Sequence, residues 1–277
     1  MNSHVLQKFH TLIITGASSG IGKSFLEHAF KMEPRLKIFN LSRRVPEGIF
    51  TTDTKLAFKH IGCDLAVREQ TDAAAAQLLL ELQAQGPEAG PILLLNNSGF
   101  GSYGEFPDPS LERNLDMIDV NVRAPVLLTG RLLPLLRARG GAVINVASTA
   151  AFQPCATMAT YGASKAFVLH WSLALREELR GSGVHVLALC PGPTSTQFFR
   201  NAGMDNAFLP DVVGQETDEV IEATLRALAA ERGMVVSGWK NKVSSFLASK
   251  LPKVLAARLA AKVIAHFRPT PGKAGAK

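Results

Sequence analysis

The chain has 277 residues, of which 47% are hydrophobic and 19% charged, a composition typical of a globular protein long enough to bury a large core. No stretch of about 18 residues is both apolar and free of charge, as a membrane-spanning helix requires, and the first ten residues hold no apolar signal core. The net charge of +7 is uneven, because ten Lys or Arg and no Asp or Glu follow from Arg232 onward, which leaves 20 basic and 23 acidic side chains before it.

The three cysteines Cys63, Cys155 and Cys190 are far apart and lack the spacing of a metal site. We therefore expect buried, reduced thiols in a cytoplasmic protein without a metal centre. The basic charge gathers at the end of the chain and is not interleaved with aromatic residues along a strand, so no nucleic-acid partner is expected.

Short apolar runs alternate with amphipathic stretches along most of the chain. The predicted strands are 11–15, 36–42, 55–65, 91–97, 141–148, 184–190 and 234–237. The predicted helices are 21–32, 70–85, 111–138, 158–180 and 217–231, with two further helical pieces up to about residue 267. Apolar strands separated by helices are typical of a parallel sheet covered on both faces. The sequence therefore predicts a doubly wound α/β fold of the Rossmann type with about seven strands.

The regular alternation ends after Cys190, in a segment rich in Gly, Pro and Phe. A long irregular segment just past a strand lies where such sheets bind ligands, so we predict that 193–214 forms a substrate lid. The alternative is a structural connection that is simply long. We expect a catalytic domain at 1–238 that includes this loop, a helical extension at 239–268 and a disordered tail at 269–277.

The first predicted strand leads into a glycine-rich turn, G-A-S-S-G-I-G. Gly16 permits a tight turn, Gly20 lets backbone N–H groups approach a pyrophosphate, and Gly22 allows helix and strand to pack closely. A bare structural corner is the alternative. The candidate cofactor contacts in this turn are Gly16, Ser18, Ser19, Gly20, Ile21 and Gly22.

The second predicted strand ends in Leu41, Ser42, Arg43 and Arg44, with no acid. A carboxylate at this point would accept hydrogen bonds from a free ribose 2′-hydroxyl and favour NAD. Arg43 instead offers a fork of donors to a 2′-phosphate, so Ser42, Arg43 and Arg44 indicate NADP(H). The alternative is an arginine that is only solvated.

Six motifs now agree in order and spacing. They are the glycine turn, NNSG at 96–99, Asn121, Ser148, the pair Tyr161 and Lys165, and Pro191-Gly192. Over about residues 10–238 the chain resembles the short-chain dehydrogenase/reductase family in its compact, Rossmann-type branch. The resemblance implies that Tyr161 exchanges a proton with the substrate oxygen while hydride passes between a nicotinamide and a carbonyl carbon.

The resemblance also implies roles for the other catalytic candidates. Ser148 would hold the substrate oxygen, although a serine at the end of a strand is also a common cap. Asn121 would shape a helix and anchor a water that links Lys165 to solvent. Tyr161 and Lys165 are four positions apart on one helical face, and an ammonium about 4 Å away would lower the tyrosine pKa from about 10 toward 7.

The remaining cofactor contacts follow from the same resemblance. Asp64 and Leu65 would contact the adenine, and Lys165 would bond the nicotinamide ribose. Ser98 stands where the family usually has alanine, and Asn96 would tie neighbouring strands together. The implied contacts are Asp64, Leu65, Asn97, Ser98, Gly99, Tyr161, Lys165, Pro191, Gly192, Thr194 and Thr196.

Seven aromatic residues are predicted near the pocket mouth, where they favour an apolar ketone or aldehyde, although several could equally belong to the core. They are Phe100, Tyr103, Phe106, Phe152, Phe198, Phe199 and Phe208. The stretch NNSGFGSYGEF and the C-terminal extension resemble the subgroup of 3-oxoacyl and broad carbonyl reductases.

The C-terminal segment 251–267 places apolar residues four apart with Lys and Arg between them. Such a basic amphipathic helix covers the protein or a partner subunit, or lies on an anionic membrane surface. The family resemblance implies a homodimer or homotetramer built through the helices at 111–138 and 158–180.

The sequence thus predicts an NADPH-dependent carbonyl reductase for a small-molecule substrate. Two alternatives remain, an alcohol dehydrogenase working in the oxidative direction and a cofactor-binding regulator or scaffold without turnover. A nucleotide-sugar epimerase shares the Tyr and Lys spacing but has a longer chain and a different glycine turn.

Overall fold

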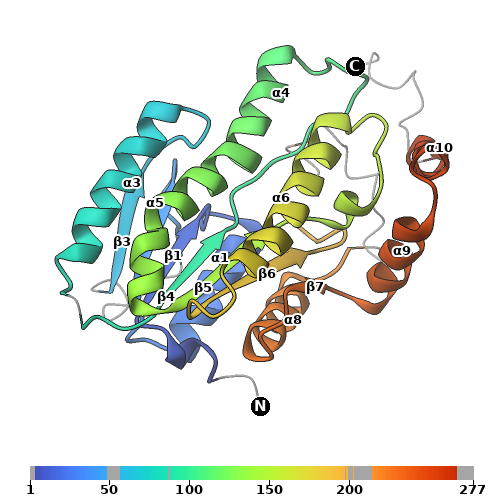
Figure 1. Cartoon of the computed structure of the whole chain (residues 1–277). Coiled ribbons are helices and arrows are strands. Elements are labelled where there is room, and N and C mark those ends of the chain that lie inside the picture. Colours follow the sequence, from blue (N-terminus) through green and yellow to red (C-terminus); the bar gives the residue numbers. More distant parts are fainter. Residues whose placement is uncertain are drawn as a thin grey trace.

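The computed structural model describes residues 4–48, 57–86, 88–196, 198, 202 and 214–266, without the side chains of 263–266. In this part of the chain, seven parallel strands form one sheet in the order β3-β2-β1-β4-β5-β6-β7 (Figure 1). The strands are β1 (Thr11–Thr15), β2 (Lys37–Ser42), β3 (Phe58–Gly62), β4 (Ile92–Asn96), β5 (Gly141–Val146), β6 (Val184–Cys190) and β7 (Met234–Val236). The predicted doubly wound α/β fold is confirmed.

Helices cover both faces of the sheet. They are α1 (Gly20–Met32), α3 (Arg68–Gln83), α4 (Leu111–Ile118), α5 (Ala124–Arg139), α6 (Ala159–Glu178), α8 (Thr217–Ala229), α9 (Trp239–Lys250) and α10 (Lys253–His266), with short helical turns η1 (Leu6–Lys8), η2 (Asp119–Arg123) and η3 (Thr149–Phe152). Helices α3, α5 and α6 lie on one face, and α1 and α8 on the other (Figure 1).

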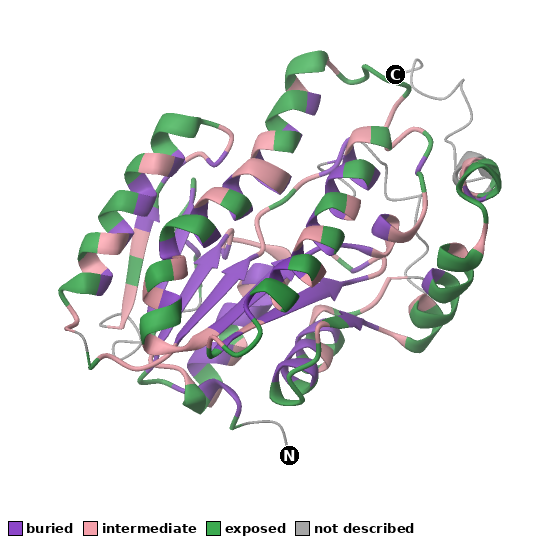
Figure 2. Cartoon of the chain, in the orientation of Figure 1, coloured by how far each residue is buried: buried purple, intermediate pink, exposed green. Residues whose placement is uncertain are grey.

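The central strands are buried because their side chains alternate between two apolar clusters, whereas β3 at the edge of the sheet is only partly buried. In β1, Leu12 and Ile14 face the cluster with α1 and α8, whereas Ile13 faces the cluster with α3 and α5. Figure 2 shows the central strands as a continuous buried layer between helices whose outer faces are exposed. This explains why the strand sequences are continuously apolar.

The predicted single helix at 111–138 is interrupted. Between α4 and α5, residues Asp119–Arg123 form a π-helical turn that contains Asn121. The side chain of Asn121 bonds both backbone groups of Phe100, which lies outside the helix. This contact between distant parts of the chain accompanies the extra residue in the helix, and apolar periodicity alone does not reveal it.

The predicted third strand at 55–65 is also shorter than expected. It ends at Gly62, and residues 49–56 lie outside the described residues. Cys63 N still donates to Ser42 O at the end of β2, and the chain then turns toward α3, where Asp64 O accepts from Val67 N.

The strand order reverses between β1 and β4, and the connections from these two strands leave on opposite sides. A crevice therefore opens at the carboxyl ends of the strands, the usual ligand site of such sheets. The predicted lid at 193–214 begins there, where Thr194 pairs with Gln215. Residues 197, 199–201 and 203–213 of this lid lie outside the described residues.

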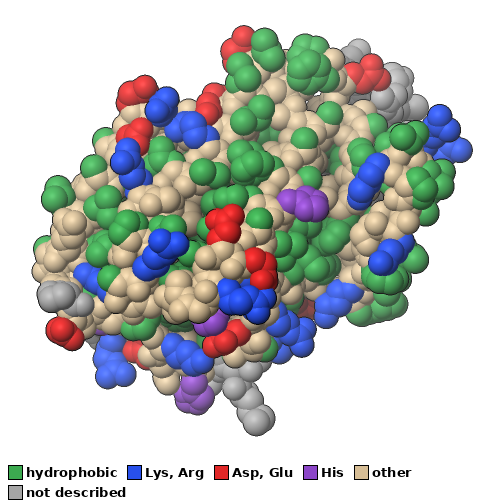
Figure 3. Space-filling view, viewed as in Figure 1, with side chains coloured by type: hydrophobic (Ala, Val, Ile, Leu, Met, Phe, Trp, Pro, Cys, Tyr) green, Lys and Arg blue, Asp and Glu red, His purple; other side chains and the backbone are tan. Residues whose placement is uncertain are grey.

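The C-terminal helix α9 stands beyond the carboxyl edge of the sheet, next to η3 and β7, and α10 follows it, with Lys253 Nζ donating to Phe152 O of η3 (Figure 1). Figure 3 shows Lys and Arg side chains spaced along this side of the molecule among apolar ones. Among the described helices none is long and apolar enough to cross a membrane.

Candidate active site

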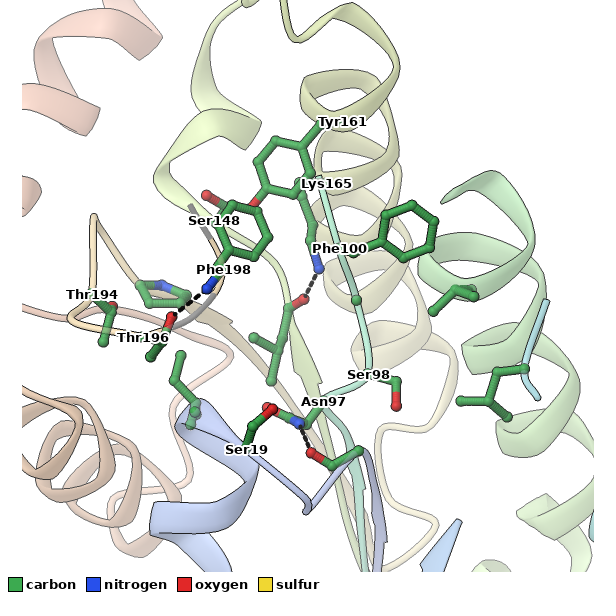
Figure 4. A pocket seen from close by; sticks show the side chains of 18 of the residues that line it. Ser19, Asn97, Ser98, Phe100, Ser148, Tyr161, Lys165, Thr194, Thr196 and Phe198 are labelled. Carbon is green, nitrogen blue, oxygen red and sulfur yellow. Dashed lines mark hydrogen bonds between the residues drawn. The ribbon is translucent and has the colours of Figure 1, made fainter. Parts of the chain in front are cut away.

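A cleft of about 870 Å³ lies at the carboxyl edge of the sheet and gathers most of the predicted site residues (Figure 4). The predicted residues that line it are Gly16, Ser18, Ser19, Gly20, Ile21, Ser42, Arg43, Arg44, Asp64, Leu65, Asn97, Ser98, Gly99, Ser148, Tyr161, Lys165, Pro191, Gly192, Thr194 and Thr196. Gly22 and Asn121 do not line it and instead support residues that do. The motifs scattered along the chain therefore meet in one place.

The glycine turn between β1 and α1 is held close to the end of β4. Gly16 has φ +72°, and a Cβ atom there would lie 2.5 Å from Ser98 Oγ. A Cβ atom on Gly22 would lie 2.4 Å from both Gly16 O and Asn97 Nδ2. Glycine is thus required at both positions, by backbone conformation at the first and by close packing at each.

The NNSG segment fixes this arrangement through hydrogen bonds. Asn97 Nδ2 donates to Thr15 O at 2.9 Å and to Gly16 O at 3.1 Å. Thr15 Oγ1 accepts from the backbone N–H groups of Asn97 and Ser98. Asn96 reaches the other way and donates to Asn145 Oδ1 on β5 at 2.8 Å, so it does link neighbouring strands.

Sequence reasoning missed Asn40, a buried residue of β2 that supports the same turn. Its Oδ1 accepts from Ala17 N at 3.1 Å, and its Nδ2 donates to Ser42 Oγ at 2.9 Å. A polar residue inside an otherwise apolar strand, next to a glycine turn, is the signal that would have found it.

Arg43 and Asp64 lie at one end of the cleft and face each other. Arg43 Nη1 is 3.6 Å from Asp64 Oδ2, and the arginine side chain is exposed. Ser42 Oγ donates to Arg44 O at 2.8 Å and so shapes the turn that carries Arg43. An exposed pair of this kind is weak, so the guanidinium can exchange its partner for another anion.

Tyr161, Lys165 and Ser148 meet at the centre of the cleft (Figure 4). All three are buried, and Ser148 forms a side-chain hydrogen bond with Tyr161. Ser148 Oγ also accepts from Ala150 N at 3.1 Å, so this serine caps the turn η3 as well. Lys165 Nζ donates to Val146 O at 2.8 Å and lies 5.9 Å from the centre of the Tyr161 ring.

The electrostatics of this pair differ from the expected ones. Burial raises the pKa of Tyr161 to about 12, although the hydrogen bond with Ser148 acts in the lowering direction. Burial also lowers the pKa of Lys165 to about 8. The expectation of a tyrosine pKa near 7 is therefore wrong for this arrangement, because burial of the phenolate raises the pKa more than the hydrogen bond with Ser148 lowers it.

Asn121 supports the catalytic candidates through hydrogen bonds outside the cleft. Its Oδ1 accepts from Phe100 N at 3.1 Å, and its Nδ2 donates to Phe100 O at 3.0 Å and to Ser164 Oγ at 3.0 Å. Ser164 donates in turn to Tyr161 O at 2.7 Å. Asn121 therefore connects the loop after β4 to the helix that carries Tyr161.

The start of the predicted lid closes over the tyrosine. The rings of Phe198 and Tyr161 are 5.2 Å apart, and Phe198 N donates to Thr196 Oγ1 at 3.2 Å. Thr194 Oγ1 donates to Gly192 O at 2.9 Å and shapes the turn after β6.

Only part of the predicted aromatic mouth is present. Phe100 and Phe198 line the cleft, but Tyr103, Phe106 and Phe152 do not. Phe106 is exposed, and Phe152 packs against an apolar cluster under α6. Phe199 and Phe208, which were also predicted at the pocket mouth, lie outside the described residues.

Further residues that sequence reasoning missed come from one face of the helix at 111–123. Arg113, Asp116 and Val120 line the cleft, and the Arg113 guanidinium carbon lies 4.0 Å from the centre of the Phe100 ring. Their spacing of three and four residues is that of a single helical face, and this pattern could have predicted that they lie together. Met158, just before α6, adds an apolar wall.

The parallel sheet, its reversed strand order and the glycine turn at the cleft define a doubly wound α/β protein of the Rossmann type. The family model described as short chain dehydrogenase matches residues 10–207, and the chain belongs to this family of oxidoreductases.

Known proteins agree with this assignment. A serine 3-dehydrogenase of Rhizobium radiobacter is 33% identical over 193 residues, which cover 68% of this chain and 73% of that protein. A short-chain dehydrogenase from Sphingobium yanoikuyae, solved in complex with NADPH, has a TM-score of 0.69 at 26% identity and covers 88% of this chain and 96% of its own.

A second solved structure differs in its cofactor. The 3-ketoacyl-(acyl-carrier-protein) reductase from Brucella melitensis, complexed with NADH, has a TM-score of 0.68 at 24% identity and covers 82% of this chain and 97% of its own. This likeness concerns the fold alone. Proteins of similar structure thus bind either NADPH or NADH.

Proposed function

We propose that the protein is an NADPH-dependent reductase that converts an apolar ketone or aldehyde to an alcohol. The observation that carries this proposal is the buried Tyr161 hydroxyl, hydrogen-bonded to Ser148 beside the buried Lys165. Because burial raises the pKa of Tyr161 to about 12, the phenol keeps its proton at neutral pH and can donate it. A protonated phenol suits reduction, in which the substrate oxygen gains a proton.

The residues around the cleft fit a dinucleotide. Gly16 and Gly20 have positive φ and carry no side chains, so backbone N–H groups at the start of α1 can face a pyrophosphate. A Cβ atom on Gly99 would lie 3.0 Å from Lys165 Nζ, so glycine at this position leaves the space next to the Lys165 ammonium free. When bound, the nicotinamide would supply the hydride.

The side chains would then act on the substrate oxygen. Ser148 holds it and shares in stabilising the charge that develops there, as an oxyanion donor does. Tyr161 gives it a proton, and the Lys165 ammonium, whose pKa is lowered to about 8 but stays above neutral pH, stabilises the tyrosinate that remains. Asn121 acts as a positioning residue, since its side chain bonds Phe100 and Ser164 and does not line the cleft.

The preference for NADP(H) over NAD is supported by Arg43, which is exposed and lies at the end of β2 without a neighbouring acid in sequence. Its present partner Asp64 is the residue expected to accept from the adenine amine. A 2′-phosphate would take the guanidinium and leave Asp64 free for that contact.

An apolar substrate is supported by Phe100, Met158 and Phe198, which line the cleft near Tyr161. The same site could run in the oxidative direction, which would need the tyrosine to lose its proton first, against its raised pKa. A regulator without turnover is the remaining alternative, and nothing in the set Ser148, Tyr161 and Lys165 is missing.

A homodimer or homotetramer is supported by exposed apolar side chains on the predicted interface helices. Leu115 and Ile118 on α4, Val126 on α5 and Phe167 on α6 are exposed. We propose a cytoplasmic location on the strength of the three free, buried cysteines.

The test is Tyr161→Phe, assayed by NADPH oxidation with a panel of acyl, aromatic and steroid ketones. We expect turnover to fall by about 10²–10⁴-fold, while the NADPH Kd measured by fluorescence titration stays within about twofold, because the phenol does not hold the nucleotide. Phe106→Tyr, at an exposed ring that does not line the cleft, serves as the control. Full activity in Tyr161→Phe contradicts the mechanism, and wild-type protein that binds NADPH but turns over no ketone contradicts the reductase.

A further inference from the structure

Helix α9 is amphipathic in the reverse of the usual sense. Its inward residues Asn241, Ser245 and Ala248 are polar or small, and Asn241 Nδ2 donates to Ser237 O at 2.9 Å. Its large apolar residues point to solvent, with Trp239 71% and Phe246 61% exposed. The exposed set is Trp239, Val243, Phe246 and Leu247. Their spacing of three or four residues makes one continuous apolar stripe.

Helix α10 repeats the arrangement. Ala256 is buried, and Ala257 and Ala260 are partly buried. Val254, Leu255 and Leu259 are exposed. Among the side chains that the structure describes, the larger apolar ones of both helices thus face away from the body of the protein, where ordinary packing would bury them.

The charges on these two helices have a single sign. The cations are Lys240, Lys242, Lys250, Lys253, Arg258 and Lys262, and no acid occurs in the chain after Glu231. Lys240 and Lys250 lie over the rings of Trp239 and Phe246, at 5.9 and 5.5 Å from the ring centres. Figure 3 shows this mixture of basic and apolar side chains along the edge formed by α9 and α10.

We propose that the exposed face of α9 and α10 docks on an anionic lipid bilayer. Apolar side chains would enter the boundary between headgroups and acyl chains, and the lysines would reach the phosphates with their stems along the apolar surface. Trp239 suits such a boundary, since tryptophan is enriched there.

Charge complementarity favours lipid over a second copy of the chain. Two copies that met through this face would bring twelve cations together without one acid, whereas an anionic headgroup layer supplies the opposite charge. The body before Arg232 carries 20 basic and 23 acidic side chains and is far less attracted to such a surface.

The docking face is joined to the cleft. A Cβ atom on Gly192, which lines the cleft, would lie 2.2 Å from Asn241 Nδ2, so the inward side of α9 packs directly on this loop. Lys253 Nζ donates to Phe152 O at 3.2 Å, in the turn that follows Ser148. A bilayer at α9 and α10 would therefore lie beside the site, although the proposal does not rest on the proposed reaction.

The test is co-sedimentation of the full chain with vesicles of phosphatidylcholine alone or mixed with phosphatidylglycerol. We expect binding to the anionic vesicles only, with loss at high salt because the lysine contacts are screened. Replacing Lys240, Lys250 and Arg258 by Gln should weaken binding by about a hundredfold. The double variant Phe246→Ser, Leu247→Ser should weaken it by about tenfold or more.

Matched controls separate this face from general charge and hydrophobicity. Lys31→Gln, Arg137→Gln, Arg180→Gln removes three exposed cations elsewhere, and Val67→Ser, Leu80→Ser removes two exposed apolar side chains near α3. Both should bind like the wild type. Since every substituted residue is exposed, circular dichroism should be unchanged in all variants.

A second measurement reads the contact directly. Brominated lipid should quench the emission of Trp239, one of two tryptophans, and the quenching should vanish in Trp239→Phe. Equal binding to neutral and anionic vesicles, or equal loss in the control variants, overturns the proposal. So does the absence of vesicle binding combined with a change of oligomeric state in Phe246→Ser, Leu247→Ser, which would assign the face to a second copy.

Discussion

At the carboxyl edge of the sheet Ser148, Asn121 and Lys165 are buried, whereas on α9 Trp239 and Phe246 are exposed. The two regions thus depart from ordinary burial in opposite directions. A buried polar group costs free energy unless it finds a partner, and an exposed apolar stripe forgoes the gain of burial. In both regions the side chains are therefore placed for binding or catalysis and not for packing the core of the protein.

The regions differ in how the departure is supported. The cleft residues are tied together, since Asn121 bonds Phe100 and Ser164, and Lys165 bonds Val146 O. The stripe on α9 needs no such support, because its inward side already fits the body through Asn241. A change at the cleft should therefore alter binding and pH dependence, and a change on the stripe should leave the isolated protein almost unaffected.

The largest expected effect concerns the charged end of the cleft. Arg43→Gln should weaken NADPH binding by about a hundredfold, because a bidentate, charge-assisted contact to the 2′-phosphate is lost, and NADH binding by less than about twofold. Fluorescence titration with both nucleotides measures the two constants. Arg35→Gln, which removes an exposed arginine paired with Glu33, is the control. A similar loss for both nucleotides would mean that Arg43 does not read the phosphate.

The next effect concerns the burial of Lys165, which lowers the pKa of its amine from the ordinary value of 10.5 to about 8 in the folded protein. Below pH 8 the buried amine carries its charge and the full cost is present. Between about pH 8 and 10.5 the folded protein has lost this proton and the unfolded chain has not, so the unfolding free energy rises with pH. Above both values the cost is gone.

Urea unfolding of wild type and Lys165→Met isolates this contribution from other titrations. The stability of wild type relative to the variant should rise by about 2 kcal/mol from about pH 8 to 9.5. Lys31→Met, at an exposed lysine, is the matched control for the substitution itself. A flat difference for Lys165→Met would show that the amine stays charged in the folded protein.

The sequence was a good guide wherever one pattern decides the outcome. Continuous apolar strands predicted the parallel sheet, and the glycine turn with NNSG predicted which segments meet at the cleft. Gly16 and Gly22 could be predicted because both belong to one strand-to-helix turn with a recognisable glycine spacing, although their closest contacts include the distant Asn97 and Ser98.

It was a poorer guide where distant parts of the chain decide. The π turn at Asn121 accompanies contacts to Phe100, 21 residues away, and Asn40 serves a turn 23 residues before it. The tyrosine pKa depends on burial under Phe198, which one helical spacing cannot reveal. The C-terminal segment was correctly predicted to be helical, yet periodicity does not say which face meets the protein.

The smallest effect sharpens the difference between the two sides of α9. Ser245 is buried, and its hydroxyl has no hydrogen-bond partner among the described residues. Ser245→Ala should therefore be neutral or slightly stabilising, whereas Ser245→Leu should cost about 1–3 kcal/mol by overpacking.

Phe246→Ser, one position further along, should change the unfolding free energy by less than about 0.5 kcal/mol, because the ring is already in water. The exposed face of this helix, with its large apolar residues, should thus tolerate a polar substitution. The inward face, with its small and polar residues, should not tolerate a large apolar one. Urea unfolding without lipid measures the unfolding free energy of all three variants, from the shift of the midpoint at an unchanged slope m. A loss above about 1 kcal/mol in Phe246→Ser would mean that part of the chain itself covers the stripe, and the contrast between α9 and the cleft would then disappear.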